Sequence, residues 1–542
     1  MKKVLIVGNG ISGLSTALTL LQNGASVTIV SPYVSERSQS VMAAGGINSV
    51  LDTSQGDSIE AHVTDTLKGG CFMEDKSAIE SLCADAPDII KYLEDIGIIF
   101  SRNPDGSVAQ RAFGGQSYNR TSYSGASTGK QIVTALSRAF RSYAAEGLAQ
   151  VLLNHYFHSA LIADGRCFGI LAYNSKDDSL IPLYADAVVM ATGGQNQLFG
   201  KTTGTTSCDG YATGKLFEQG VTLRNLEFIQ YHPTTIETPA KRMLITEAAR
   251  GEGGRLFYLD GSTKVYFMED KYGPAGNLMP RDIVAKGIYD APSQVYLDIA
   301  FLGEKLIKER LPEVYDLCME YINLDVTKEP IPVYPSVHFF MGGIRVNNSH
   351  RSNIEALYAV GECASKYHGA NRLGGNSLLA ACHSGRAAAF DILDRLSSLP
   401  IPDFSDYIQS ETNIFNKAKE SKSSFPADMI LKEIATIMNT SLGITRNEAK
   451  LREGIESVEF YESKLNVLRF DKDVSLYMSY RLKPMALLAK AILMAADNRK
   501  ESRGAHIRED FPDKDDSLAK PTIVCYKDGE ILISIEDENY DS

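Results

Sequence analysis

Histidine and arginine recur in five short stretches between residues 231 and 379, each of which contains or borders glycine or proline. The stretches read YHPTT, ITEAARGEGGR, MPRDIVAKGI, SVHFFMGGI and HGANRLGGNSLL. Each alone has an ordinary explanation, because a lone histidine is more often structural and an arginine beside an aspartate usually forms an ion pair. Together they predict an anion-binding site. Its candidate residues are His232, Thr246, Glu247, Arg250, Arg281, His338 and Arg372.

These residue types suit a planar dicarboxylate that is held at both ends. The arginine fork matches the two oxygens of one carboxylate. Histidines and a threonine can hold the other carboxylate and twist it out of conjugation. A proton donor opposite a hydride source would complete the site, so the cluster is a candidate for reductive chemistry on a small diacid.

The N-terminus predicts the scaffold that positions this chemistry. KVLIV reads as a short strand, GNGISG follows it, LSTALTLLQNG reads as an amphipathic helix, and SVTIV reads as the next strand. This order is the dinucleotide-binding fingerprint in its expected context. Gly8 allows the turn, Gly10 lets a pyrophosphate approach the backbone, and Gly13 lets the helix pack closely on the sheet. The positive end of the helix then faces the phosphates.

One residue departs from this fingerprint at the end of the second strand. The pattern has an acidic residue there for the ribose, whereas this chain has Ser31. A serine hydroxyl can hydrogen-bond a ribose hydroxyl, and it can equally be an ordinary residue at the end of a strand. Both interpretations stay open.

Strands of the same nucleotide-binding unit return late in the chain. ADAVVMATGG (Ala185–Gly194) and NIEALYAVGE (Asn353–Glu362) read as buried strands that run into glycine. Their position implies that an insertion interrupts the first domain. From about residue 401 the apolar residues follow the 3.6-residue period of helices, and the last stretch carries a predicted hairpin about YKDGE before an acidic tail.

Composition limits the function classes. The chain has 542 residues, of which 44% are hydrophobic and 23% charged, which is typical of a globular protein with about two to four domains. The formal net charge of −12 argues against nucleic-acid binding. A locally basic pocket for an acidic small molecule remains compatible with that charge.

Cysteine usage and hydropathy predict the compartment. The eight cysteines show no CxxC pair and no metal-ligand spacing, which indicates a reducing environment and no iron–sulfur cluster in this chain. The N-terminus reads as a strand rather than a secretory signal, and no uncharged apolar run approaches the roughly 18–20 residues that span a bilayer. We therefore expect a cytoplasmic protein without a membrane span of its own.

Seven motifs together carry a resemblance to a known family. They are GGIN, RTSYSGASTG, ARGEGGR, MPRD, HFFMGG, GANRLGGNSLL and ESRGAHIREDFPDKDD. Over nearly its whole length the chain resembles the flavoprotein subunit of the succinate dehydrogenase/fumarate reductase family, whose sibling is L-aspartate oxidase. The resemblance implies an α/β fold, in which a capping domain of α+β type interrupts a Rossmann-like FAD-binding domain and a helical domain follows. The expected segments are 1–230 and 345–400 for FAD binding, 231–344 for the cap, 401–500 for the helices and 501–542 for the C-terminal segment.

The resemblance also implies roles for the cationic cluster. Arg281 would protonate the alpha carbon of the substrate while N5 of the flavin delivers hydride to the beta carbon, and Glu247 and Arg250 would pass protons to Arg281 from solvent. Arginine is an unusual acid because its pKa lies far above neutrality, so clustered cations and desolvation must ease the departure of its proton. The residues that would bind the carboxylates of fumarate or succinate are His232, Thr246, His338 and Arg372.

The FAD site follows from the resemblance in the same way. Gly8, Gly10 and Gly13 would hold the pyrophosphate, with Ser31 near the adenosine ribose. The helix that begins at NSLLAACHSG would point its N-terminus at the flavin and favour the anionic reduced form, although it can equally be ordinary core. The further residues expected around the cofactor are Ser38, Gln39, Ser40, Ala44, Gly45, Gly46, Asp209, Glu362, Ser377 and Leu378.

Gln39 is the position at which the chain departs from most respiratory members. They read Arg-Ser-His there, with the histidine bonded covalently to the flavin, and this chain reads Arg37-Ser38-Gln39. An amide cannot form that bond, so noncovalent FAD is expected. Because the covalent link supports succinate oxidation more than fumarate reduction, we expect a fumarate reductase that oxidises succinate poorly. The alternative is a descendant of a covalently linked enzyme that drifts toward another substrate.

Two rival functions stay open at this point. L-aspartate oxidase also holds FAD noncovalently, but its sequence is similar to EGGHS, with a glutamate, at the position where this chain reads RAFGGQSYNR. This chain has Phe113 and no carboxylate there. A non-enzymatic FAD electron carrier is the other rival, and it would have no use for a dicarboxylate site. A nicotinamide dehydrogenase is disfavoured because no second GxGxxG follows the first.

The resemblance implies partners as well. An iron–sulfur subunit like that of the family is the expected electron donor, and it could tie the chain to the inner face of the cell membrane.

Overall fold

The fold is that of a computed structural model, which describes residues 1–125, 127–239, 241–420, 427–465 and 476–536. Its centre is a five-stranded parallel sheet in the order β20-β10-β1-β2-β6. The strands are β1 (Lys3–Val7), β2 (Ser26–Ser31), β6 (Ala149–Leu153), β10 (Ala187–Met190) and β20 (Leu357–Ala359). The predicted return of late strands to the first unit is confirmed, since β10 pairs with β1 and β20 pairs with β10.

The two faces of this sheet are covered differently. Successive side chains of a strand point to opposite faces, and Val4 and Ile6 pack with the helices whereas Leu5 and Val7 pack with a three-stranded antiparallel sheet. The helices are α1 (Ile11–Gln22), α3 (Lys76–Asp95), α4 (Thr128–Ala145) and α11 (Asn376–Arg395), and the strands are β7 (His155–Ala163), β8 (Arg166–Asn174) and β9 (Ser179–Tyr184). Burial on both faces explains the continuous apolar runs of the parallel strands.

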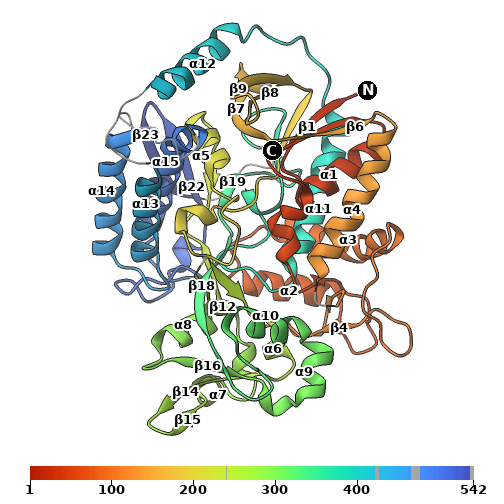
Figure 1. Ribbon diagram of the computed structural model, residues 1–542, viewed down its shortest axis with the longest axis vertical. Helices are drawn as coiled ribbons and strands as arrows, with labels where there is room; N and C mark the ends of the chain where they lie inside the picture. The colour runs from red at the N-terminus through yellow and green to blue at the C-terminus, as the bar shows by residue number, and fades with distance from the viewer. Residues whose placement is uncertain (126, 240, 421–426, 466–475, 537–542) are drawn as a thin grey trace.

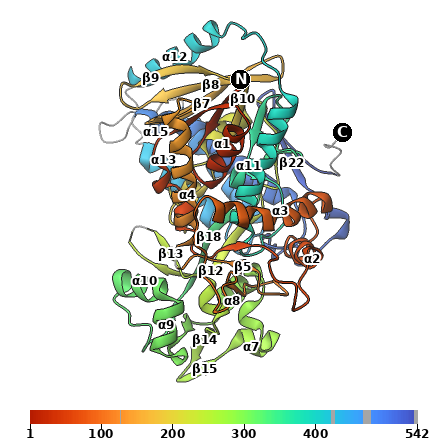
Figure 2. The ribbon, with the colours of Figure 1, turned by 90° about the vertical axis from the view of Figure 1, so that its right-hand side faces the viewer.

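The cap lies at one end of the molecule, at the bottom of Figure 1 and Figure 2. It contains the sheet β13-β12-β18 and the sheet β15-β14-β16-β17. Its strands are β12 (Ile229–Glu237), β13 (Arg242–Leu244), β14 (Arg255–Asp260), β15 (Thr263–Val265), β16 (Val295–Asp298), β17 (Ile331–Pro332) and β18 (Tyr334–Phe340). Its helices are α6 (Ala248–Gly251), α7 (Phe267–Tyr272), α8 (Arg281–Asp290), α9 (Glu304–Arg310) and α10 (Pro312–Ile322). The short strands β3 (Ile47–Asn48), β4 (Gln110–Arg111) and β5 (Thr121–Ser122) form a further sheet, and β5 and α2 (Ile59–Gly69) lie beside the cap (Figure 2).

The C-terminal part is helical, as its periodicity predicts. Its helices are α12 (Ser405–Glu420), α13 (Ala427–Ser441), α14 (Glu448–Lys464) and α15 (Leu476–Asn498). α15 packs along α5 (Tyr211–Glu218), where the backbone of Pro484 approaches Gly214 so closely that a Cβ there would clash. Within the described ranges, no helix combines the length and the apolar character that a bilayer crossing requires.

The predicted hairpin about YKDGE is confirmed, and its docking site was not foreseen. Strands β22 (Thr522–Lys527) and β23 (Glu530–Ile535) extend the sheet β21-β19-β11-β22-β23. The other strands are β11 (Leu223–Arg224), β19 (Gly343–Arg345) and β21 (Ala364–Ser365). Because β11 leads into the cap and β19 leads out of it, the hairpin fastens the base of the cap. The acidic tail, residues 537–542, lies outside the described residues, and the exact boundaries of the five expected segments stay a prediction.

Candidate active site

One cavity of about 990 Å³ brings nearly all the candidate residues together. It begins at the turn between β1 and α1, follows the segment 31–46, and ends against the cap. The walls include His232, Thr246, Glu247, Arg281, His338 and Arg372 from the cationic cluster. They also include Gly8, Gly10, Ser31, Ser38, Gln39, Ser40, Ala44, Gly45, Gly46, Asp209, Glu362, Ser377 and Leu378 from the expected cofactor site. Arg250 and Gly13 lie behind this lining.

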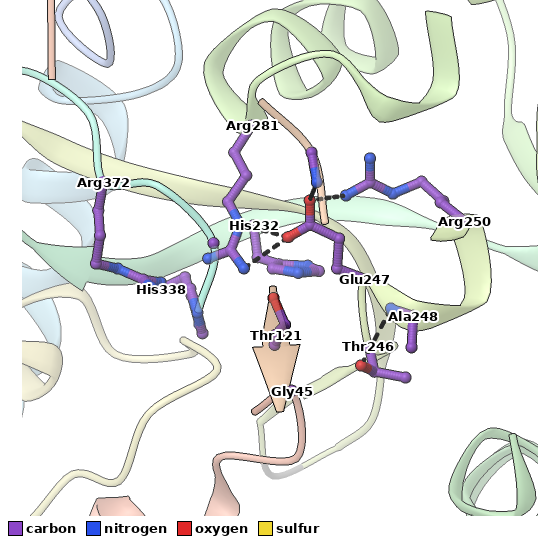
Figure 3. A network of polar contacts seen from close by, with 12 residues as sticks. Gly45, Thr121, His232, Thr246, Glu247, Ala248, Arg250, Arg281, His338 and Arg372 are labelled. Atoms are coloured by element: carbon purple, nitrogen blue, oxygen red, sulfur yellow. Dashed lines mark hydrogen bonds and ion pairs between the residues drawn. The ribbon is translucent and has the colours of Figure 1, made fainter. Parts of the chain in front are cut away.

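Arg281 is held on two edges of its guanidinium. It is the first residue of α8, and its Nε and Nη2 donate to Oε2 of Glu247 at 2.9 and 2.7 Å. Its Nη1 donates to Oε1 of Gln230 at 3.1 Å. Asp282, its neighbour in sequence, instead accepts from Asn371 at 2.9 Å. The guanidinium is therefore fixed, with the remaining N–H groups available to the cavity (Figure 3).

Glu247 connects Arg281 to a second arginine. Its Oε1 accepts from the amide of Gly114 at 2.7 Å and lies 3.6 Å from Nη2 of Arg250. Burial raises the pKa of Glu247, but Arg281 and Arg250 outweigh burial, so that the pKa lies below its ordinary value. Arg250, on the single turn α6, is 1% exposed and donates from Nη1 to the carbonyl of Asn277 at 2.5 Å. A line of charged groups thus runs from Arg250 through Glu247 to Arg281.

Two histidines and Arg372 complete the cluster. His232 on β12 and His338 on β18 lie on adjacent antiparallel strands, with ring centroids 5.1 Å apart. Nδ1 of His338 lies 2.8 Å from Oγ1 of Thr203. The Arg372 guanidinium lies 4.3 Å from the centroid of the Phe339 ring. Figure 3 shows these groups gathered beside Arg281.

The cluster carries more positive than negative charge. Burial and the neighbouring arginines lower the pKa of His232 and of His338 well below its usual range, so both rings are neutral at pH 7. Burial and Arg281 likewise lower the pKa of Arg372. Arg281 and Arg250 share the ionised carboxylate of Glu247. Glu362 and Glu247 raise the pKa of Arg372 but form no ion pair with it among the described residues, and a buried cation that is not fully compensated is costly. The arrangement is therefore suited to an anionic ligand.

The other predicted site residues are held by hydrogen bonds or have a shifted pKa. The Thr246 hydroxyl accepts from the Ala248 amide at 3.3 Å at the start of α6. Ser31 Oγ donates to the Tyr33 carbonyl at 2.9 Å, which leaves both interpretations of Ser31 open. Gln39 Oε1 accepts from the Thr205 amide at 2.7 Å. Burial raises the pKa of Glu362 to about 7.

The first half of the cavity fits a dinucleotide. α1 begins after Gly10, which provides no capping side chain, and the Ile11 amide donates to Ser40 Oγ at 3.2 Å. A helix N-terminus of this kind can bind phosphate. Gly46 has φ of 133°, and a Cβ there would lie 2.5 Å from the Ser122 carbonyl. Ser38 Oγ is buried without a hydrogen-bond partner in the described structure. A cavity of this volume is at the upper end for ligand sites, as a large cofactor requires.

Sequence reasoning missed two residues of this site. Gln230 lies two positions before His232 on β12, and strand alternation places both on one face, so this signal was available. Arg481 on α15 pairs with Asp209 inside the cavity. No local pattern connects residues so far apart in sequence.

Comparison with known proteins identifies the family. Residues 3–378 match the family described as FAD binding domain, and residues 431–541 match the family described as Fumarate reductase flavoprotein C-term. The first match alone spans more than half of the chain. The chain belongs to the succinate dehydrogenase/fumarate reductase flavoprotein family.

Relatives of this family match over nearly the full length. The succinate dehydrogenase flavoprotein subunit of Bacillus subtilis is 33% identical over 96% of this chain and 93% of its own. One subunit of the fumarate reductase (CoM/CoB) of Methanothermobacter marburgensis is 32% identical, with 94% of each chain covered. The FrdA chain of an E. coli quinol fumarate reductase variant superimposes with a TM-score of 0.89 at 31% identity, covering 99% of this chain and 97% of that one. The predicted family, fold class and FAD cofactor are thereby confirmed.

Proposed function

We propose that this chain is the flavoprotein subunit of a fumarate reductase and that fumarate is reduced at the Arg281 end of the cavity. The observation that carries the proposal is the fixed Arg281 guanidinium, bonded to Glu247 and Gln230 within a group of incompletely compensated cations. A redox protein without a diacid substrate would gain nothing from burying these charges, because each one costs desolvation energy.

The chain's own residues then divide the work. FAD, when bound, supplies a hydride to one olefinic carbon. Arg281 donates a proton to the other carbon, and the two transfers together convert fumarate to succinate. Glu247 and Arg250 pass protons from solvent to Arg281. The carboxylates of the substrate are bound by His232, Thr246, His338 and Arg372.

Cationic surroundings help an arginine to act as the acid. Each nearby positive charge disfavours the charged form of its neighbours, and the cluster holds three guanidiniums in a buried space. A negative charge that develops on the substrate carboxylate is stabilised by the same groups, because these buried cations are already oriented toward it.

We further propose that FAD is held noncovalently and that fumarate reduction is favoured over succinate oxidation. Gln39 occupies the position of the family's linking histidine, and its side-chain oxygen is already bonded to the Thr205 amide. An amide nitrogen is not a nucleophile that would attach to a flavin. The bond to Thr205 instead ties Gln39 to another segment that lines the cavity.

Partners and compartment belong to the same proposal. The relatives from B. subtilis and M. marburgensis are named as subunits, which supports a partner subunit for this chain. The partner that we propose is an iron–sulfur subunit that delivers electrons. All eight cysteines are free thiols, which supports a reducing, cytoplasmic location, with contact to a membrane made through partners.

Turnover of the purified holoprotein tests the proposal. We expect reduced-dye-coupled reduction of fumarate, slow oxidation of succinate, and a flavin absorbance change on adding fumarate, succinate or malonate. Precipitation with acid should leave the flavin in the supernatant. Flavin in the pellet would refute noncovalent binding. Turnover of L-aspartate with release of peroxide, and no response to fumarate, would replace the proposal by the aspartate oxidase alternative.

A further inference from the structure

The cavity has a second end, lined by aromatic rings, that the diacid chemistry does not use. We call it the tyrosine arm, and it consists of Tyr33, Tyr156, Tyr173, Tyr211 and Tyr477. Tyr33 lies just beyond the end of β2, the strand whose carboxyl end faces the ribose in dinucleotide-binding folds. With the phosphates at the start of α1, the adenosine half of the cofactor must enter this arm.

The rings of the tyrosine arm come from both ends of the chain. Tyr477 of α15 stacks on Tyr173 of β8 with centroids 4.0 Å apart and also lies 5.2 Å from Tyr156 of β7. Its hydroxyl donates to the Phe157 carbonyl at 2.6 Å, and the Tyr211 hydroxyl donates to the His158 carbonyl at 2.7 Å. These bonds fix α15 and α5 against β7, so the helical part of the chain forms a wall of the cofactor cavity.

Arg481 brings a positive charge into this arm. It follows Tyr477 by one helical turn, is 8% exposed, and lines the cavity. Its guanidinium carbon lies 5.6, 5.2 and 5.4 Å from the ring centroids of Tyr156, Tyr211 and Tyr477. Asp209 pairs with it. Burial lowers the pKa of Arg481 to about 10, which leaves it charged at neutral pH.

We propose that Arg481 is a cofactor-binding residue and that it binds the adenosine diphosphate half of FAD. A guanidinium both stacks on aromatic planes and donates two parallel hydrogen bonds to a phosphate. Its place among three rings, beside Asp209 and next to the ribose end of β2, provides for either contact. The C-terminal helical part is consequently a component of the FAD site, and cofactor binding is coupled to the docking of α15. The proposal does not depend on the reduction of fumarate.

The other explanation of Arg481 is purely structural, with the Asp209 pair holding α15 onto α5. The two explanations differ in ligand selectivity. A structural role affects every ligand of the cavity alike. A cofactor contact affects ligands that contain the adenosine diphosphate half and spares those that lack it.

The experiment measures binding of FAD, FMN and ADP to the full-length apoprotein, prepared by removing FAD or by riboflavin-limited expression. Wild type is compared with Arg481→Met, Arg481→Lys and the control Arg452→Met, whose side chain is 63% exposed on α14. For Arg481→Met we expect FAD and ADP affinities to fall about tenfold or more while FMN affinity is unchanged. Arg481→Lys should recover part of the loss, and Arg452→Met should match wild type.

Two results would overturn the proposal. One is unchanged ADP binding in Arg481→Met, and the other is an equal loss for FAD, FMN and ADP together with a lower melting temperature. If Arg481→Met does not fold, hydrogen exchange of residues 476–498 in the wild-type apoprotein decides the question. ADP must then protect this helix and FMN must leave it unprotected, and equal exchange with both ligands rejects the contact. Competition by adenosine against ADP shows which part of the ligand Arg481 contacts. Adenosine competes well if Arg481 stacks on the adenine ring and poorly if Arg481 binds the phosphates.

Discussion

Two groups of buried arginines in this protein differ in how fully the chain satisfies them. The C-terminal group consists of Arg499, Glu227, Glu501 and His506. Arg499 donates from every guanidinium nitrogen, and its partners include the carboxylates of Glu227 and Glu501 at 2.6 and 2.9 Å. Three backbone or hydroxyl oxygens take its other bonds. At the catalytic end, Nε and Nη2 of Arg250 and Nε of Arg372 are buried without a hydrogen-bond partner in the described structure.

The difference separates a structural arginine from a functional one. A buried charge whose partners all come from its own chain is neutralised when folding is complete, and removing it leaves those partners unpaired. A buried charge that folding leaves uncompensated lowers stability and persists only where a ligand completes it. Arg499 fastens the C-terminal segment to the start of β12, whereas Arg250 and Arg372 keep buried guanidinium nitrogens that no described residue satisfies.

The largest expected effect is the loss of fumarate reduction when the proton donor of the catalytic group is replaced. Arg281→Gln should lower the rate of fumarate reduction by roughly 10³-fold or more, because loss of a positioned acid costs about 10² to 10⁴ and charge stabilisation is lost with it. FAD content and the melting temperature should stay near wild type. Steady-state turnover with a reduced dye, together with the flavin-to-protein ratio, measures both. Wild-type turnover in this variant would reject the assignment of Arg281.

A stability experiment compares the two groups directly. Arg499→Met leaves Glu227 and Glu501 buried without their cation, which should cost about 3–5 kcal/mol of stability. Arg372→Met removes a cation whose pKa is already depressed by burial and by Arg281, so stability should be unchanged or increased while dicarboxylate binding is lost. Thermal unfolding of both FAD-loaded variants, without and with malonate, gives the answer. Equal destabilisation by the two substitutions would remove the distinction between the groups.

The catalytic group could be predicted from the sequence, whereas the pairing within the C-terminal group could not. The glycine fingerprint and the strand periods predicted the parallel sheet, because both are local patterns. The cationic cluster was visible because its residues lie in glycine- and proline-bordered motifs. The pairing of Arg499 with Glu227, and of Arg481 with Asp209, is set by tertiary packing between residues more than 250 positions apart. No propensity or spacing reports such a contact, even though ESRGAHIREDFPDKDD was recognised as a motif.

The smallest expected effect distinguishes the histidines of the two groups. Burial lowers the pKa of His506 in the C-terminal group, and of His232 and His338 at the catalytic end, well below the usual range. A bound dianion favours the protonated form of the two catalytic rings and raises their pKa, whereas His506 does not line the ligand cavity. Fumarate binding to the oxidised enzyme should therefore take up protons in the pH range around and below the ordinary histidine pKa of about 6.5.

The sign of the pH dependence follows from that uptake. Because the complex binds more protons than the free enzyme, fumarate affinity must rise as the pH falls through this range. Calorimetric titrations at pH 6 in two buffers of different ionisation enthalpy should report a fraction of a proton, up to about one. His338→Asn should reduce the uptake, and His506→Asn should leave it unchanged. Zero uptake or proton release in the wild-type enzyme would show that the histidines do not sense the substrate, and the carboxylates would then be bound by the arginines and Thr246 without them.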